Sequence, residues 1–518
     1  MTVSQPLDTT PETTTTDATS YYSAEALENL AVLEQRVRED IEATSHAHSW
    51  VPEVAGTDYN VLIIGGGQAG LGAAFALKRE NLGKIQIFEA GEPAGNGCWI
   101  NYARMHTLRS PKHMKGIELD VPSLHIRRWF EAVYGAEVWD RIKLVPRLDW
   151  DAYLRWYEKM TEAPVQYRTK VTAVHKPTEP NGPFTVDAVI TGKDGALEKI
   201  SVTAQRVIFA SGLTGGGSIN VLPEIAELPS ALWAHTQDPI DFEALAGKKI
   251  LVIGAGASGY DNAGTALEAG AANVTVLMRR TEVPSNNPLR WMEFPGMQEH
   301  FFDLTDAEKW EFSAFNGGLP QPPTQHAIWR CFRHDNFELV RGAQVSSYKL
   351  KDGGAQVTAT ISTPEGERVE DFDFVISATG YKVDLTKRPE LAEFIDDILL
   401  WEEVYAPSAS HPMGKNPYLG DGFQFTARDA SAAPYLSRLH HFSTAARASM
   451  GVTGNQLSGI YGGIKRIGWA VSRDVTRENW GGFMEGFRNF EALEISSVGP
   501  HTEADGWFPQ TNRYSKDH

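Results

Sequence analysis

Two short glycine-rich segments have the residue types and the spacing that hold a dinucleotide by its pyrophosphate. In each, the first glycine permits a tight turn, the second leaves room for the pyrophosphate, and the third lets a helix pack closely on the preceding strand. The N-terminus of that helix then faces the anion. The predicted contacts are Gly65, Gly67, Gln68, Ala69 and Gly70 in one segment and Gly254, Gly256, Ala257, Ser258 and Gly259 in the other.

Each segment lies between two apolar runs of the kind that form buried parallel strands. Residues 61–64 and 84–89 flank the first turn and its helix, and residues 250–253 and 274–277 flank the second. Strand, glycine turn, helix and second strand make a βαβ unit. One such turn is weak evidence, but two in the same context predict an α/β protein with two Rossmann-like dinucleotide-binding domains.

The end of the second strand distinguishes the two sites. Glu89 lies as far beyond Gly65 as Met278 lies beyond Gly254, and Arg279-Arg280 follow Met278 directly. A carboxylate at this place accepts hydrogen bonds from a ribose 2′-hydroxyl and repels a 2′-phosphate. Glu89 therefore predicts FAD or NAD in the first site, whereas Arg279 and Arg280 predict NADP(H) in the second. The alternative is that the two arginines only form a solvated strand end.

Two further segments repeat each other and indicate how the domains are connected. Residues 207–212 and 375–380 are apolar strands that end in small residues, and cofactor contacts are predicted at Ala210, Ser211 and Thr379. We expect the chain to leave the first domain after one copy and return after the other, so that the NADP domain is inserted into the FAD domain. The predicted ranges are 58–224 and 381–518 for the FAD domain and 225–380 for the NADP domain, with an aromatic-rich insertion at 284–336.

The N-terminal region stands apart from these domains. Residues 1–22 are rich in threonine and are predicted to be disordered, and residues 23–57 to form a helix and a linker. Ser23 can cap that helix. We expect its apolar stripe to pack on the body or on a second subunit, and it comprises Leu27, Leu30, Leu33, Val37 and Ile41.

Composition excludes several classes of protein. The formal charge of −18 disfavours nucleic acid as a partner, and no apolar run approaches the roughly 20 residues of a membrane span. The N-terminus lacks the basic and apolar regions of a secretory signal. The only cysteines, Cys98 and Cys331, form neither a disulfide framework nor a CxxC pair, which fits the cytoplasm. The sequence shows no metal-ligand spacing, so no metal is expected.

In the order of its motifs the chain resembles the class B flavoprotein monooxygenases, which include the flavin-containing, N-hydroxylating and Baeyer–Villiger enzymes. The resemblance covers roughly residues 58–480 as an ordered set of motifs. Residues 254–261, GAGASGYD, are similar to the GxGNSGxD of the flavin-containing branch. Residues 378–381, ATGY, match the flavin-containing and N-hydroxylating branches, and residues 107–111, TLRSP, are similar to a TLRxP segment beside the flavin of amine N-hydroxylases.

The family fingerprint FxGxxxHxxx(F/Y/W) is broken. It would fall around His235, but Pro229, Ala231 and Pro239 replace the Phe, the Gly and the closing aromatic residue. His235 is therefore either a weak catalytic candidate or a residue of the link between the domains. The departure argues against the flavin-containing and Baeyer–Villiger subfamilies proper.

The resemblance implies an enzyme in which NADPH reduces FAD and the reduced flavin traps O2 as a hydroperoxyflavin. One oxygen atom then enters a small organic substrate, at nitrogen in preference to a Baeyer–Villiger or sulfide oxygenation. A flavin disulfide reductase shares this layout but needs a redox-active cysteine pair. A non-catalytic nucleotide sensor stays open as a third hypothesis.

The resemblance also assigns residues around the flavin. Trp99 is expected near the isoalloxazine, with Arg109 as a further catalytic candidate, and the strand at 170–174 is expected to contact the adenine through Val171. Gly454 and Gln456 precede the helix that closes the flavin site in relatives. The aromatic segment 284–336 either lines the mouth of the active site or forms a helical packing layer. A homodimer is a family expectation.

Overall fold

The computed structural model describes residues 22–45, 50–52, 54–93, 97–452, 454, 456–492, 495 and 498–499. The predicted disordered segment 1–22 lies outside them except for its last residue. Contacts divide the chain into a unit of residues 1–472 and a unit of residues 473–518, and the second contains the end of one helix and a further helix, α14 (Trp480–Arg488). The remaining description concerns the first unit.

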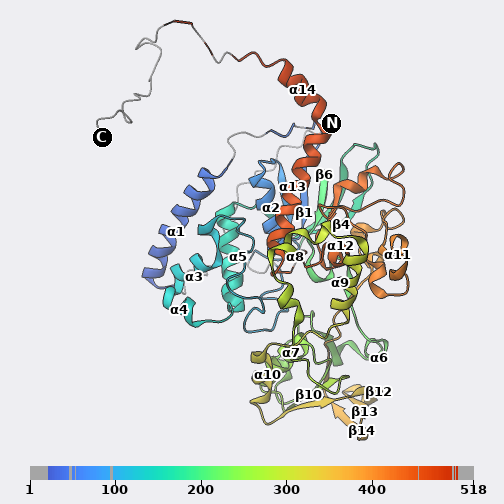
Figure 1. Cartoon of the computed structure of the whole chain (residues 1–518). Helices are drawn as coiled ribbons and strands as arrows, with labels where there is room; N and C mark the ends of the chain where they lie inside the picture. The colour runs from blue at the N-terminus through green and yellow to red at the C-terminus, as the bar shows by residue number, and fades with distance from the viewer. Residues whose placement is uncertain are drawn as a thin grey trace. The chain divides into compact units, whose positions relative to one another are not determined.

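The first glycine turn belongs to a seven-stranded sheet with the order β3-β2-β1-β6-β5-β4, to which β17 is added beside β6. Figure 1 labels β1, β4 and β6 of this sheet. Strands β1, β2, β3, β17 and the end of β6 run parallel, while β4 and β5 form an antiparallel extension. The strands are β1 (Tyr59–Ile64), β2 (Ile85–Phe88), β3 (Val165–Gln166), β4 (Thr169–His175), β5 (Phe184–Thr191), β6 (Leu197–Phe209) and β17 (Leu439–His441).

The second glycine turn belongs to a separate, wholly parallel sheet of five strands, β11-β10-β9-β15-β8. All five lie in the sequence between β6 and β17, which pair with each other in the first sheet, so the second domain is inserted into the first. The strands are β8 (Trp233–His235), β9 (Lys249–Ile253), β10 (Asn273–Met278), β11 (Phe337–Arg341) and β15 (Phe374–Ser377).

The outgoing and returning chains run side by side. β7 (Gly217–Ile219) and β16 (Tyr381–Val383) pair antiparallel directly after the two repeated strand ends. The inserted fold predicted from the repeats is therefore confirmed, while the residue boundaries of the domains stay a prediction. A small antiparallel sheet of β12 (Gln344–Lys351), β13 (Gln356–Thr363) and β14 (Gly366–Phe372) accompanies the inserted sheet.

Equivalent helices follow the two turns, α2 (Gln68–Arg79) and α7 (Ala257–Glu268). α13 (Ile460–Glu478) packs on α2, where Gly72 lies against Ile464 and Gly468 lies against Ala76. The other helices are α1 (Ala24–Ala43), α3 (Ile126–Tyr134), α4 (Ala136–Arg141), α5 (Arg147–Thr161), α6 (Pro223–Ala226), α8 (Pro295–His300), α9 (Asp306–Gly318), α10 (Gln325–Phe332), α11 (Trp401–Val404), α12 (Arg447–Met450) and α13 (Ile460–Glu478).

The N-terminal helix is present, but its buried stripe differs from the prediction. Ser23 caps α1 through its side chain, which accepts a hydrogen bond from the Ala26 amide. Leu30 and Val37 are buried as expected, whereas Leu27 is 40% exposed and Ala26 takes its place. Leu33 and Ile41 are half-buried, and the inward face of α1 packs against α3 and α5.

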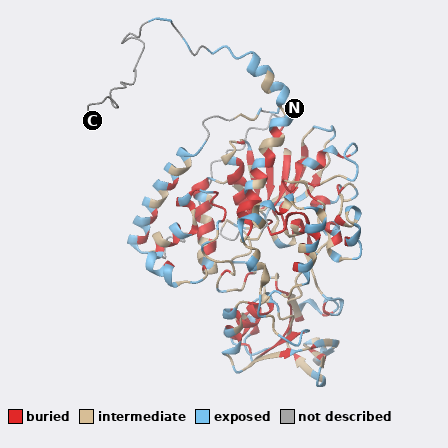
Figure 2. Ribbon diagram, viewed as in Figure 1, coloured by how far each residue is buried: buried red, intermediate tan, exposed pale blue. Residues whose placement is uncertain are grey.

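The aromatic segment 284–336 divides between the two alternatives. Phe301 and Trp310 are buried, and Trp310 packs against Trp401 with ring centroids 5.9 Å apart, as in a helical packing layer. Trp291 and Trp329, in contrast, are largely exposed. Buried residues concentrate on the strands of both sheets (Figure 2). Among the described helices, none has the length and apolarity to cross a membrane.

His441, at the end of β17, makes folding stability depend on pH. The ring is wholly buried, and burial lowers its pKa to about 3. The unfolded chain binds this proton near pH 6.5 and the folded chain does not, so stability falls as the pH falls below that value. The expected loss is about 1.4 kcal/mol per pH unit below 6.5, measured as a shift of the urea midpoint between pH 7 and pH 5.

Comparing wild type with a variant that lacks this ring separates the contribution of His441 to stability from the effects of low pH on all other groups. His441→Phe removes the titrating ring, so wild type should lose more stability than the variant on acidification. His175 is expected to affect the pH dependence of stability in the opposite direction, because hydrogen bonds to Asp187 and Glu393 raise its pKa. Its contribution is present at low pH and is lost as the pH rises. Equal pH slopes for wild type and His441→Phe would contradict the assignment.

Candidate active site

The two glycine turns have almost the same geometry. Gly65 and Gly254 have φ angles of +109° and +108°, which side chains rarely adopt. A Cβ at either would lie 2.6 Å from a carbonyl oxygen, of Ala210 in one turn and of Ala378 in the other. The first glycine of each turn therefore packs against the repeated strand end that was predicted to contact the cofactor.

The third glycine of each turn closes the helix onto the strand. A Cβ at Gly70 would lie 1.9 Å from the carbonyl oxygen of Gly65, and one at Gly259 would lie 2.0 Å from that of Gly254. No side chain larger than hydrogen fits at these distances. Helices α2 and α7 thus begin directly against their strands, as the spacing predicts.

The second glycine faces open space in both turns. Among the residues that the structure describes, a Cβ at Gly67 would meet only the Gly97 Cα, at 3.7 Å, and one at Gly256 would meet nothing within 4 Å. Open space above a helix N-terminus is where a pyrophosphate binds in βαβ units. The residues present therefore fit a dinucleotide at each turn.

Glu89 lies beside the first turn and is held by backbone amides. Its two carboxylate oxygens accept hydrogen bonds from the amides of Gly66, at 2.6 Å, and Gly91, at 2.7 Å. The Glu89 carbonyl also accepts from Thr169, the first residue of β4, so Val171 lies two residues along a strand that starts at the predicted ribose site. The structure brings these predicted contacts together.

The second site differs from the first at the position equivalent to Glu89. Met278, the counterpart of Glu89, is buried as the last residue of β10, while Arg279 and Arg280 are exposed just beyond it. Gly256 and Ser258 are also exposed at the start of α7. This end of the second sheet therefore presents two guanidinium groups and no carboxylate at the position of Glu89.

Trp99 and Gln68 both contact Trp150 of α5. The Trp99 and Trp150 rings are 6.3 Å apart, edge to face, and the Trp150 indole donates to the Gln68 side chain at 3.3 Å. Arg147 donates to the carbonyls of Trp99 and Met105, which fixes the intervening segment. Two residues predicted to bind the first cofactor thus both contact Trp150.

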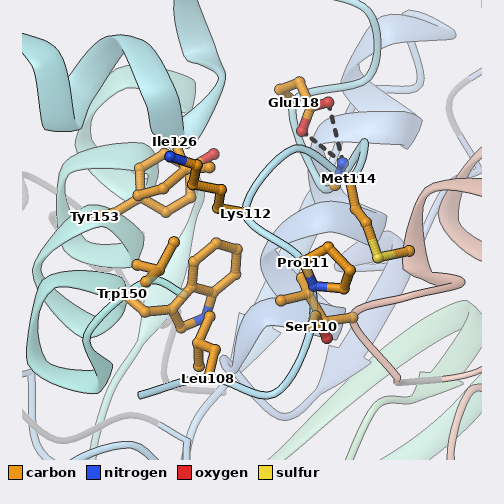
Figure 3. A pocket seen from close by; sticks show the side chains of 12 residues that line it. Leu108, Ser110, Pro111, Lys112, Met114, Glu118, Ile126, Trp150 and Tyr153 are labelled. Atoms are coloured by element: carbon orange, nitrogen blue, oxygen red, sulfur yellow. Dashed lines mark hydrogen bonds between the residues drawn. The ribbon is translucent and has the colours of Figure 1, made fainter. Parts of the chain in front are cut away.

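A small pocket lies between α5 and the segment that follows the TLRSP motif (Figure 3). Trp150 and Tyr153 line one side, and Pro111 and Met114 line the other. The Glu118 carboxylate accepts two hydrogen bonds from the Gly116 amide and holds this loop in place. The loop therefore has a defined conformation beside the predicted flavin contacts.

Arg109 of the TLRSP motif connects the two domains. Its guanidinium donates to the Asp261 carboxylate of α7 at 2.7 Å. Burial raises the pKa of Asp261, and Arg109 partly offsets that effect. Arg330 of α10, which is buried, donates to Glu268 and to the carbonyls of Arg104 and Asp261. This placement gives Arg109 a role in holding the domains together.

Sequence reasoning missed Asp261 and Arg330 as parts of this interface. Asp261 belongs to the GASGYD motif, so its proximity to the second dinucleotide site was readable. Arg330 had no comparable signal, because its partners lie far away along the chain.

The remaining predicted cofactor contacts differ in the partners that they have in the structure. The Ser211 hydroxyl is buried without a hydrogen-bond partner among the described residues, as a group facing a cofactor would be. Thr379, in contrast, bonds to Asn220 and Ser377 and supports the β7–β16 crossing. Gly454 lies beside the Ser443 carbonyl, and the carbonyl of Gln456 accepts from Gly459 just before α13.

His235 has a structural placement. It ends β8 and is wholly buried, with one ring nitrogen 3.0 Å from the Gly380 carbonyl and the other accepting from the Gln237 amide. Burial lowers its pKa. Its ring is therefore occupied by backbone contacts, one of them to Gly380 at the predicted boundary of the inserted domain.

The two cysteines are both free. Burial raises the pKa of Cys98 to about 11, and the buried Cys331 donates to the Tyr260 carbonyl. Thiols protonated at neutral pH are poor nucleophiles. Within the described ranges, no cluster of His, Cys, Asp and Glu could hold a metal ion.

Comparisons with known proteins agree with this geometry. The family model for pyridine nucleotide-disulphide oxidoreductases matches residues 62–316. Two solved structures share the fold, each with a TM-score of 0.60: an ornithine N-hydroxylase from Kutzneria sp. 744, 17% identical and covering 80% of this chain and 99% of its own, and an L-lysine 6-monooxygenase from Pseudomonas syringae, 16% identical and covering 81% and 99%.

A curated relative is considerably more similar in sequence. The FAD-dependent urate hydroxylase of Xanthomonas campestris pv. campestris is 35% identical over 480 residues, which cover 91% of this chain and 98% of that protein. An alignment of this length includes both dinucleotide turns and the inserted sheet. The chain therefore belongs to the class B flavoprotein monooxygenases.

Proposed function

We propose that this protein is an NADPH-dependent FAD monooxygenase that transfers one oxygen atom from O2 to a small nitrogen-containing molecule. The observation that carries the proposal is the pair of matched turns with different strand ends. Glu89 stands beside the first turn, whereas the second turn has Met278 at the equivalent position and Arg279 and Arg280 directly after it. The first site is thus built for a free ribose hydroxyl and the second for a 2′-phosphate.

The residues of this chain would bind, orient and shield the cofactors. The open space at Gly67 and Gly256 takes the pyrophosphates, and the Glu89 carboxylate, already oriented by two amides, accepts from the ribose. Arg279 and Arg280 bind the 2′-phosphate. Bound FAD supplies the redox chemistry that accepts a hydride from NADPH and activates O2. Trp99 and Trp150 provide an apolar wall that limits access of water.

Urate is the first substrate to test, because the relative at 35% identity is a urate hydroxylase. N-Hydroxylation of an amine is the alternative favoured by the ATGY and TLRSP motifs. Baeyer–Villiger or sulfide oxygenation would use the same cofactors. A sensor without turnover would bind both nucleotides but consume no O2.

A labelled-oxygen experiment separates these possibilities. The flavin-loaded protein is incubated with NADPH, ¹⁸O2 and, in turn, urate, L-ornithine, a sulfide and a ketone. We expect NADPH oxidation to increase with a nitrogen compound and one ¹⁸O atom to appear in the product by mass spectrometry. Label in none of the four products, with NADPH consumed only to form hydrogen peroxide or not at all, would contradict the proposal.

The disulfide reductase named by the family model is a weaker alternative. Such an enzyme needs a reactive thiolate, whereas the pKa of Cys98 is raised to about 11 and Cys331 is buried. A cytoplasmic location and a homodimer complete the proposal. The free cysteines fit a reducing compartment.

A further inference from the structure

A cavity of about 480 Å³ lies beside the predicted flavin contacts. Three segments line it: the loop after the TLRSP motif, the aromatic segment around α8, and the start of α13. Lys115 comes from the first, Arg290, Glu293 and Gln298 from the second, and Tyr461 from the third. Ligand-binding pockets typically have volumes of about 300–1,000 Å³, so the cavity is large enough for a small molecule.

Two of these walls continue directly from segments assigned to the flavin. The loop begins two residues after Arg109, whose carbonyl accepts a hydrogen bond from Arg290. The α13 wall begins two residues after Gln456, and the Gln298 side chain donates to the Ser458 carbonyl. These bonds hold the aromatic segment against both flavin-contact segments, so a molecule in the cavity would lie next to the flavin.

Glu293 gives the cavity a carboxylate that accepts no hydrogen bond from the part of the chain that the structure describes. Its side chain is only 16% exposed, and its nearest charged partner among the described residues, Arg290, is 3.8 Å away, beyond hydrogen-bond distance. Burial raises its pKa. A desolvated carboxylate in this position gains from a ligand that donates an N–H group.

Two cationic side chains also line the cavity. Arg290 lies beside Glu293, and Lys115 lies on the loop wall, paired with Asp120 and 4.6 Å from the centre of the Tyr461 ring. These cations can donate hydrogen bonds to carbonyl or anionic oxygens of a ligand. Adjacent donor and acceptor groups match the N–H and C=O edge of a ring amide or ureide.

We propose that this cavity binds the substrate, and that the substrate is a small ring compound with amide-type N–H groups beside carbonyl oxygens. Glu293 accepts from the N–H groups, while Arg290 and Lys115 bind the oxygens. This inference rests on the proposed function, because it places the substrate of that reaction. Glu293, Arg290 and Lys115 act here as binding residues that position the ring.

Calorimetric titration of urate into the oxidised, flavin-loaded protein tests the assignment without NADPH or turnover. Wild type should bind urate and should bind L-ornithine far more weakly. Glu293→Gln and Arg290→Ala should each weaken urate binding about 10-fold, since each exchanges or removes a charge-assisted hydrogen bond. The matched control, Glu311→Gln on the exposed face of α9, should bind urate as wild type does.

Several results would overturn the inference. Unchanged urate affinity in both cavity variants would remove Glu293 and Arg290 from the site, and preferential binding of L-ornithine would mean that the ligand class is wrong. Loss of flavin from folded Glu293→Gln protein would assign the cavity to the cofactor. Failure of NADPH to reduce the flavin would instead contradict the proposed function, whatever the affinity for urate.

Discussion

Replacing Gly70 with alanine is expected to give a protein that retains no flavin. The new Cβ would lie 1.9 Å from the Gly65 carbonyl oxygen, which is backbone and cannot rotate away. The helix must then move off the strand, and the space for the pyrophosphate is distorted. Overpacking of this kind costs about 1–3 kcal/mol or more, and a clash with backbone belongs at the upper end. The flavin absorbance of the purified protein measures the result.

Gly259→Ala provides the matched change in the second domain. The clash is almost identical, at 2.0 Å from the Gly254 carbonyl oxygen, but it lies at the site assigned to NADPH. This variant should keep its flavin and lose NADPH affinity. Gly481→Ala is the neutral control, because no atom of the described part of the chain lies within 4 Å of the added Cβ in α14. A flavin content in Gly70→Ala equal to that of wild type would contradict the assignment of the first turn.

The double variant Arg279→Ala/Arg280→Ala should lose its preference for NADPH. Each guanidinium contributes charge-assisted hydrogen bonds to a 2′-phosphate, so kcat/KM for NADPH should fall about 10- to 100-fold. The value for NADH should be almost unchanged, because NADH has no phosphate at that position. Steady-state rates with both nucleotides measure the ratio directly.

Removal of two exposed arginines from α1 controls for the change in net charge. Arg36 and Arg38 are exposed on that helix, and Arg36→Ala/Arg38→Ala should leave the nucleotide preference as in wild type. An equal fall in kcat/KM for NADPH and NADH in the Arg279/Arg280 variant would show that these residues support the fold and do not recognise the phosphate.

The glycine turns could be predicted because their geometry is local. Gly65 and Gly254 each occupy a conformation set by the next few residues, and the apolar runs on either side determine the strands. The repeated strand ends at Ala210 and Ala378 also allowed the inserted domain to be predicted. In the structure, each of them packs against the first glycine of its turn. Sequence spacing is sufficient where one βαβ unit contains all the partners.

The interface and the cavity could not be predicted in the same way. Arg109 meets Asp261 across 152 positions of sequence, and Arg290 meets Arg109 across 181. Their pairing depends on how the inserted domain packs against the first one, which no local pattern encodes. The partners of His235, the Gly380 carbonyl and the Gln237 amide, could likewise not be read from the broken fingerprint around it.

Anaerobic mixing of the flavin-loaded protein with each nicotinamide nucleotide tests the central claim most directly. The absorbance of oxidised flavin reports hydride transfer from the second site to the first and does not depend on the identity of the substrate. The account predicts that NADPH bleaches the flavin much faster than NADH does. Reduction by neither nucleotide, or a preference for NADH, would contradict it.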